Sequence, residues 1–175
     1  MKRFSSNENL LASMNYNDGK TLVVGSKIYG ECVDRRTLYT DAIGLDMQSG
    51  DGVDIVHNLD APIPEEYGKF DHVDCSSVLE HCKRPWLVAE NIQQAMNPKA
   101  TLYVQAPFVW RVHDYPGDYF RYTTESLAIL FPLIRWTKLG YFSNGQFRKL
   151  TGSLRHSEKI YMERSEAVGV GFLID

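Results

Sequence analysis

The sequence has few cysteines and no excess of charge of either sign. Its three cysteines, Cys32, Cys75 and Cys82, form no CxxC pair. A disulfide framework is therefore not expected, and a reducing cytoplasm is the predicted location. The 19 Lys and Arg residues stand against 22 Asp and Glu residues, so the formal net charge is −3. Because affinity for nucleic-acid phosphate comes chiefly from clustered positive charge, the composition carries no strong nucleic-acid signal.

Long apolar runs are also missing. No stretch approaches the roughly 20 apolar residues that span a bilayer, and no signal-peptide block follows Met1. The chain has neither internal repeats nor low-complexity tracts, and its 43% hydrophobic and 23% charged residues are typical of globular proteins. We therefore expect a single domain over residues 1–175 with no membrane partner.

Short apolar runs, by contrast, recur along the chain and alternate with helical patterns. Helices are predicted over residues 7–15, from Pro85 to the Asn97-Pro98 stop, and from Thr123 or Thr124 to Phe131. Strands are predicted over 20–25, 42–46, 53–57, 70–76, 101–106, 135–142 and 167–174. This alternation favours the α/β class. We expect a three-layer, Rossmann-like doubly wound fold with a mostly parallel seven-stranded sheet and an antiparallel C-terminal hairpin at its edge.

One connection fits this scheme poorly. Only residues 47–52 separate the second and third predicted strands, whereas a parallel crossover normally takes a dozen residues or more. Two alternatives follow: the crossover is a bare extended loop, or the third strand is short and irregular.

The carboxyl ends of parallel strands are where ligands bind in such sheets. Gly25 and Gly30 frame the turn after the first strand, with neither the lysine of a phosphate-binding loop nor the three glycines of a dinucleotide fingerprint. They indicate either a close approach to a ligand or a plain strand-ending turn. Asp46 ends the second strand, where a carboxylate binds the hydroxyls of a ribose or, alternatively, caps a turn.

Three longer segments are more specific. They are GLDMQSGDGVDIVHNL (44–59), FDHVDCSSVLEHCKRPW (70–86) and APFVWRVHDYPGDYFRYTTESL (106–127). Together with VVGSKIYG they resemble the class I S-adenosylmethionine-dependent methyltransferases, and more narrowly the type 11 group. The middle segment is the most specific, because FD, a strand, LEH and a proline-started helix are that group's usual fourth-strand signature.

The resemblance implies S-adenosyl-L-methionine as cofactor and S-adenosyl-L-homocysteine as product. Gly25 and Ser26 would approach the methionine part, Asp46 would bind the ribose and Met47 would lie against the adenine. The full implied cofactor set is Gly25, Ser26, Lys27, Gly30, Asp46, Met47, Asn58, Leu59, Asp60, Cys75 and Ser76. Asn58 and Leu59 would flank the adenine edge, with Asp60 as a possible amine acceptor, and Cys75 and Ser76 would offer backbone contacts near the sulfonium. The usual GxGxG is reduced here to Gly25 and Gly30.

The segment from Trp110 to Arg121 is rich in aromatic and polar residues and follows the fifth strand. It is interpreted as an acceptor pocket, in which His113, Asp114 or Tyr115 polarises a nucleophile and Trp110 or Tyr119 shields the sulfonium. The alternative is structural: Asp118 pairs with Arg121, and the aromatic rings anchor the loop.

His81, in the LEH triplet, is a further catalytic candidate, or else a histidine that merely holds its turn. Cys75, His81 and Cys82 lack a second ligand pair at zinc-site spacing, so no metal is predicted. The leading hypothesis is a methyltransferase with a small-molecule acceptor. A non-catalytic binding or scaffold domain and a nicotinamide-dependent oxidoreductase are the alternatives, and a homodimer through edge strands stays open.

Overall fold

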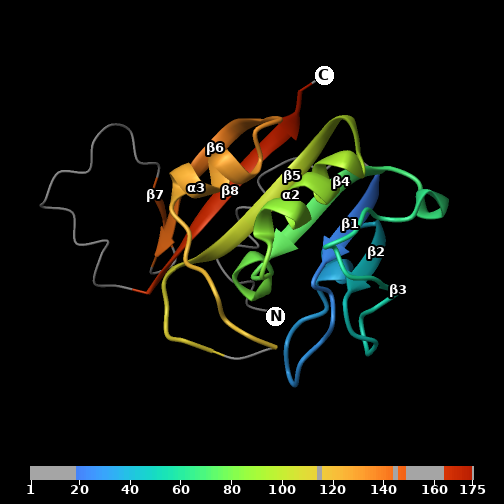
Figure 1. The fold of residues 1–175 in the computed structure, drawn as a ribbon, viewed down its shortest axis with the longest axis horizontal. Helices are drawn as coiled ribbons and strands as arrows, with labels where there is room; N and C mark the ends of the chain where they lie inside the picture. The colour runs from blue at the N-terminus through green and yellow to red at the C-terminus, as the bar shows by residue number, and fades with distance from the viewer. Residues whose placement is uncertain (1–18, 114–115, 144–145, 149–163, 175) are drawn as a thin grey trace, which may run out of the picture.

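A computed structural model describes residues 19–113, 116–143, 146–148 and 164–174. These residues form one mixed sheet with the strand order β3-β2-β1-β4-β5-β8-β6-β7 (Figure 1). Strands β1 to β5 run parallel to one another. Their bounds are Lys20–Val24, Asp41–Asp46, Ile55–Val56, Phe70–Ser76 and Met96–Val109.

The last strands confirm the predicted antiparallel arrangement. Strand β8 (Ser165–Leu173) lies between β5 and β6 (Ile134–Ser143) and pairs antiparallel with both. A three-residue strand, β7 (Gln146–Arg148), adds an eighth member at the edge, which the sequence did not predict. The Rossmann-like fold, a mostly parallel sheet with an antiparallel C-terminal hairpin, is thereby confirmed.

The two α-helices of the described residues begin where the sequence predicts. Helix α2 spans Pro85–Gln94 with its proline in the first turn, and α3 spans Thr124–Leu130 behind a Thr123 capping box. Both helices contact each other and pack on one face of the sheet (Figure 1). The helix predicted over residues 7–15 lies outside the described residues.

The opposite face of the sheet has a different cover. Tyr103, whose neighbours Leu102 and Val104 point toward the helices, packs here with residues of β8. The cover includes the 3-10 helix η1 (Arg35–Leu38). Arg35 of η1 pairs with the buried Asp74 of β4, with 2.6 Å between Nη2 and Oδ2. Within the described ranges, α-helices therefore cover one face, and the η1 segment lies on the other.

The connection between β2 and β3 is a loop without a helix, and the third strand is short, so both expected features are present. Strand β3 has only two residues, and the connection contains no helix. The loop folds back instead: the Ile28 N–H donates to Asp51 O at 2.9 Å, and the Asp54 N–H donates to Gly44 O at 2.8 Å. The loops after β1 and β2 thus support each other.

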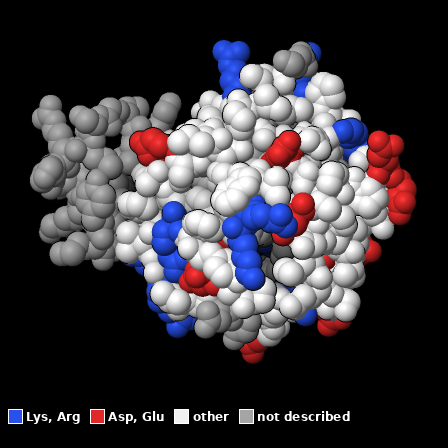
Figure 2. Space-filling view, in the orientation of Figure 1, with Lys and Arg blue, Asp and Glu red and all other residues white. Residues whose placement is uncertain are grey.

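Charge is mixed on the face that carries α2 and α3. Figure 2 shows Lys and Arg interspersed with Asp and Glu on this face, without a large patch of one sign. In the described part of the chain, no helix combines the length and apolarity needed to cross a membrane.

Candidate active site

Gly25 joins the carboxyl ends of three strands. Its φ of +68° is unfavourable for other residues, and a Cβ placed there would lie 2.5 Å from Cγ2 of Val78, just beyond β4. Its N–H donates to Leu45 O of β2 at 2.8 Å. The turn therefore requires glycine. It draws β1, β2 and β4 together along the side of the sheet where the parallel strands end, which we call the carboxyl edge.

Asp46 stands at the same edge and is 9% exposed. Its Oδ1 accepts the Gln48 N–H at 2.9 Å, and its Oδ2 accepts the Lys27 N–H at 3.3 Å. The carboxylate therefore caps the turn, as one sequence alternative proposed. Each oxygen keeps a second lone pair. Its charge acts with burial to raise the pKa of Tyr29 above the usual range, burial being the larger cause.

The remaining residues of the β1 loop differ in their surroundings. Ser26 is buried, and its Oγ has no hydrogen-bond partner in the described residues. Lys27 donates to Gln48 Oε1 at 3.0 Å and lies over the Tyr29 ring. Gly30 has φ +56°, with open space where a Cβ would stand.

Next to Asp46 the edge carries apolar surface. Met47 is 53% exposed and Val56 58% exposed at the ends of β2 and β3. The Leu59 side chain belongs to the core, so only its backbone can face a ligand. Asn58 Oδ1 accepts the Asp60 N–H, and the Asp60 carboxylate pairs with Arg84 at 2.7 Å.

Cys75 is fully buried in the core under the helices. Burial raises the pKa of its thiol well above the ordinary range. Its side chain is therefore a packing group, which is compatible only with the backbone role that the resemblance implies. Ser76 ends β4 beside it.

The loop after β5 is clamped onto the 3-10 helix η3 (Leu79–His81), which starts directly after Val78. The Tyr119 N–H donates to Glu80 O at 2.7 Å, and the Tyr122 hydroxyl donates to Leu79 O at 2.8 Å. His81 Nδ1 lies 2.5 Å from Gly117 O. The carboxyl edge thus has two halves: the turns around Gly25 and Asp46, and the loop after β5. Because Val78 also contacts the Gly25 turn, η3 connects these two halves.

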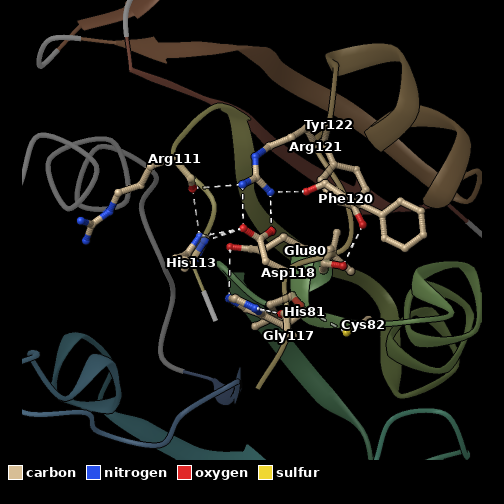
Figure 3. Close-up of polar contacts among 12 residues, drawn as sticks. Glu80, His81, Cys82, Arg111, His113, Gly117, Asp118, Phe120, Arg121 and Tyr122 are labelled. Atoms are coloured by element: carbon tan, nitrogen blue, oxygen red, sulfur yellow. Dashed lines mark hydrogen bonds and ion pairs between the residues drawn. The ribbon is translucent and has the colours of Figure 1, made fainter. Parts of the chain in front are cut away.

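Asp118 organises this loop. The carboxylate is 1% exposed and accepts both Nη groups of Arg121 and the His113 N–H at 2.8 Å, as drawn in Figure 3. The Arg121 hydrogen bonds hold the pKa of Asp118 well below its usual range. The Asp118–Arg121 pair that the sequence suggested is present, and it fixes the position of His113.

Glu80 is a residue of this site that no sequence pattern singles out. Its side chain is 1% exposed, and burial raises the pKa of its carboxyl to about 8. Oε1 lies 3.7 Å from His81 Nε2, while buried Oε2 has no hydrogen-bond partner among the described residues. Glu80 stands in the LEH triplet, but a glutamate is by default expected in solvent, so only its burial makes it conspicuous.

The two aromatic rings proposed as sulfonium shields already face cations of the chain. Arg164 lies over the Trp110 ring at 3.3 Å from its centroid, and Lys83 lies 6.0 Å from that of Tyr119. Both rings therefore also anchor the loop, as the structural alternative proposed. Asp114 and Tyr115 lie outside the described residues.

Sequence comparisons do not identify a family. No family model matches the chain, and no curated protein matches it. Solved structures do match. A putative methyltransferase from Haloferax volcanii, in complex with the Trm112 methyltransferase activator, is 16% identical with a TM-score of 0.64, over 98% of this chain and 89% of that one.

Two further neighbours differ in their chemistry. The Burkholderia thailandensis 1,6-didemethyltoxoflavin-N1-methyltransferase, solved with S-adenosylhomocysteine, is 10% identical with a TM-score of 0.67, over 96% of this chain and 76% of that one. The [4+2]-cyclase SpnF is 13% identical with the same TM-score, over 97% and 81%. Likeness at such identities shows the fold alone: the chain has the Rossmann-like fold of class I methyltransferases.

Proposed function

We propose that the protein is an S-adenosylmethionine-dependent methyltransferase of the type 11 kind that acts on a small molecule. The observation that carries this proposal is the meeting of Gly25, Asp46 and Val78 at one edge of a sheet with the methyltransferase fold. A backbone turn free of side chains and a carboxylate on the next strand suit the methionine and ribose parts of the cofactor.

The cofactor would lie along the ends of β1, β2 and β4. Asp46 would accept the ribose hydroxyls with its remaining lone pairs. The exposed Met47 and Val56 side chains offer apolar surface for the adenine. Gly25 and Ser26 would face the methionine part, with Cys75 and Ser76 presenting backbone near the sulfonium.

The acceptor would lie against η3 and the loop after β5. The sulfonium activates the methyl group, so the protein must mainly align the two reactants, exclude water and take a proton. His113, oriented by Asp118, and His81, held by Gly117 O, are the candidate bases. Asp114 and Tyr115 are carried in the proposal from the sequence alone.

A second candidate is a binding or scaffold module without catalysis. It is favoured by the Asp46 carboxylate, whose two oxygens are already bonded to backbone N–H groups, and by the two aromatic rings that face Arg164 and Lys83. In either case we propose that residues 1–175 act as one domain in the cytoplasm. A homodimer and a protein partner are compatible with both candidates.

Calorimetric titration of the purified chain with S-adenosylhomocysteine tests the proposal, with NAD as the comparison ligand. We expect saturable binding of the first ligand and none of the second. At about 100 times the dissociation constant, the bound ligand should add roughly 2.7 kcal/mol to the free energy of unfolding, which raises the melting temperature by roughly 5–10 °C.

Two matched variants locate the site. Asp46→Asn should weaken binding at least about tenfold, because it removes the charge that accepts the ribose hydroxyls. Asp41→Asn changes an exposed aspartate at the opposite end of the same strand and should leave the affinity unchanged. Absence of binding to the unaltered chain at millimolar ligand would favour the scaffold module. Equal affinity of both variants would refute the role of Asp46.

A further inference from the structure

Three side chains of the kinds that bind metal ions lie close together where η3 meets the loop after β5. One ligand atom from each of Glu80, His81 and His113 lies within 4.8 Å of the other two. The imidazole rings stand edge to face with centroids 4.9 Å apart. Figure 3 shows the three side chains turned toward one another. Two residues come from η3 and one from the distant loop, so only the fold assembles them.

In the described part of the chain, the hydrogen-bond partners of the two histidines lie at Nδ1, which leaves Nε2 of each ring for a ligand. His81 Nδ1 faces Gly117 O at 2.5 Å, and His113 Nδ1 faces Asp118 Oδ2 at 3.1 Å. A carbonyl and a carboxylate only accept, so each Nδ1 carries the proton and each neutral ring keeps its lone pair on Nε2. Metal-binding histidines are oriented by such carbonyl and carboxylate partners.

The surroundings of the Glu80 carboxylate are a second, independent observation that points to a bound cation. Its side chain is almost wholly buried, yet Oε2 lacks any hydrogen-bond partner in the described part of the chain. A buried oxygen without a partner costs free energy. Oε1 of the same carboxylate faces His81 Nε2 at 3.7 Å, so a cation bound by this carboxylate beside the histidines would give the buried group a partner.

We propose that Glu80, His81 and His113 bind one divalent first-row transition-metal ion. Two imidazoles and one carboxylate are a ligand set that suits zinc, iron or manganese rather than calcium or magnesium. Three protein ligands leave coordination positions open for water or for an oxygen of a bound molecule. The proposal is tested without reference to the methyltransferase assignment, because its readout is binding of the ion alone. With the ion bound, His81 and His113 would act as ligands and not as bases.

The test is titration of the tag-free, chelator-treated full chain with ZnCl2, followed by calorimetry without S-adenosylmethionine. We expect one ion per chain with micromolar or tighter affinity, and at least tenfold weaker binding of MgCl2. Cobalt(II) added in place of zinc should give visible d–d absorption bands typical of nitrogen and oxygen ligands.

Variants separate this site from adventitious binding. His113→Ala and Glu80→Gln should each weaken zinc binding about 100-fold. Asp118→Asn, which alters only the partner of His113, should weaken it about 10- to 100-fold. His57→Asn, outside the cluster, should leave it unchanged. Circular dichroism checks that each variant is folded. Glu80→Gln is nearly isosteric, so it still tests the proposal if the other variants do not fold.

Two outcomes would overturn the proposal. One is the absence of a stoichiometric zinc site in the unaltered chain. The other is undiminished binding by folded Glu80→Gln and His113→Ala, which would reveal an adventitious ion only. Binding of S-adenosylhomocysteine is measured separately without metal, so failure of one proposal is distinguishable from failure of the other.

Discussion

The two halves of the carboxyl edge are built by different means. Around Gly25 and Asp46, backbone N–H groups bond to strand carbonyls and to one carboxylate, and a side chain at Gly25 would clash with Val78. Around Asp118 and η3, by contrast, a buried carboxylate paired with the half-buried Arg121, together with two histidines, holds the loop. The first half is a shape made by backbone, and the second is a network of polar side chains.

Because of this difference, the two halves should tolerate different substitutions. A backbone-built turn is sensitive to the addition of a single methyl group, because a Cβ at Gly25 would meet Val78. A buried polar network is sensitive to the loss of any partner, because an unpaired buried charge or donor is left behind. Variants in the two halves should therefore fail in different ways.

The largest effect is expected for Gly25→Ala. The left-handed backbone costs an alanine about 1–2 kcal/mol, and displacing Val78 adds about 1–3 kcal/mol. We expect a loss of about 3–4 kcal/mol in the free energy of unfolding, measured by urea denaturation. Gly30→Ala has a similar φ but open space around the new Cβ, so it should lose only about 1 kcal/mol. Equal losses would show that the Val78 contact is unimportant.

Asp118→Ala comes next. Removal of this buried carboxylate leaves Arg121 and the His113 N–H without their partner, which should cost about 3 kcal/mol in denaturant unfolding. The matched control, Arg84→Ala, breaks the exposed pair with Asp60 and should cost at most about 1 kcal/mol. If Asp118→Ala cost no more than this control, the loop would not depend on its ion pair.

Tyr122→Phe should have a smaller effect, restricted to the clamp between the loop and η3. It removes the hydroxyl that donates to Leu79 O, at a cost of about 1–2 kcal/mol. Amide hydrogen exchange should become faster around η3 and residues 116–122 while β1 and β2 stay protected. Faster exchange in all of these segments would mean that the two halves unfold together.

The smallest effect is expected far from the edge, at Asp71 near the amino end of β4. The Asn97 side chain and the Lys20 N–H donate to this carboxylate and lower its pKa below the ordinary value. Its stabilising contribution is therefore present above the unfolded pKa of about 3.9 and is lost as the pH falls through the lower folded value.

Unfolding of the unaltered chain and Asp71→Asn at pH 7 and pH 3 measures this contribution. The difference in stability between the two should shrink at the lower pH. A constant difference would show that the charge of Asp71 does not contribute. Binding of S-adenosylhomocysteine at pH 7 should be the same in both, because Asp71 lies at the opposite end of the strand.

Several elements were predictable because their causes are local. Helix α2 begins at Pro85 and α3 at a Thr123 cap, and both signals lie within a few residues of the helix start. The buried parallel strands β1, β2 and β4 follow short apolar runs. Strand β5 begins earlier than predicted, at Met96, and runs on to Val109. Its two prolines, Pro98 and Pro107, lie at irregularities in the pairing with β4 and β8, where a strand tolerates proline.

The sequence by itself determined the alternation of strands and helices, hence the fold class, and placed Gly25 and Asp46 at strand ends. Periodicity, proline and capping residues act over short distances, so they can be read along the chain. Only the tertiary structure decided the partners of Asp118, the burial of Glu80 and the meeting of His81 with His113. These depend on a loop returning to η3 from a remote part of the sequence, and burial, which sets the charge state of such groups, is a property of the packed molecule.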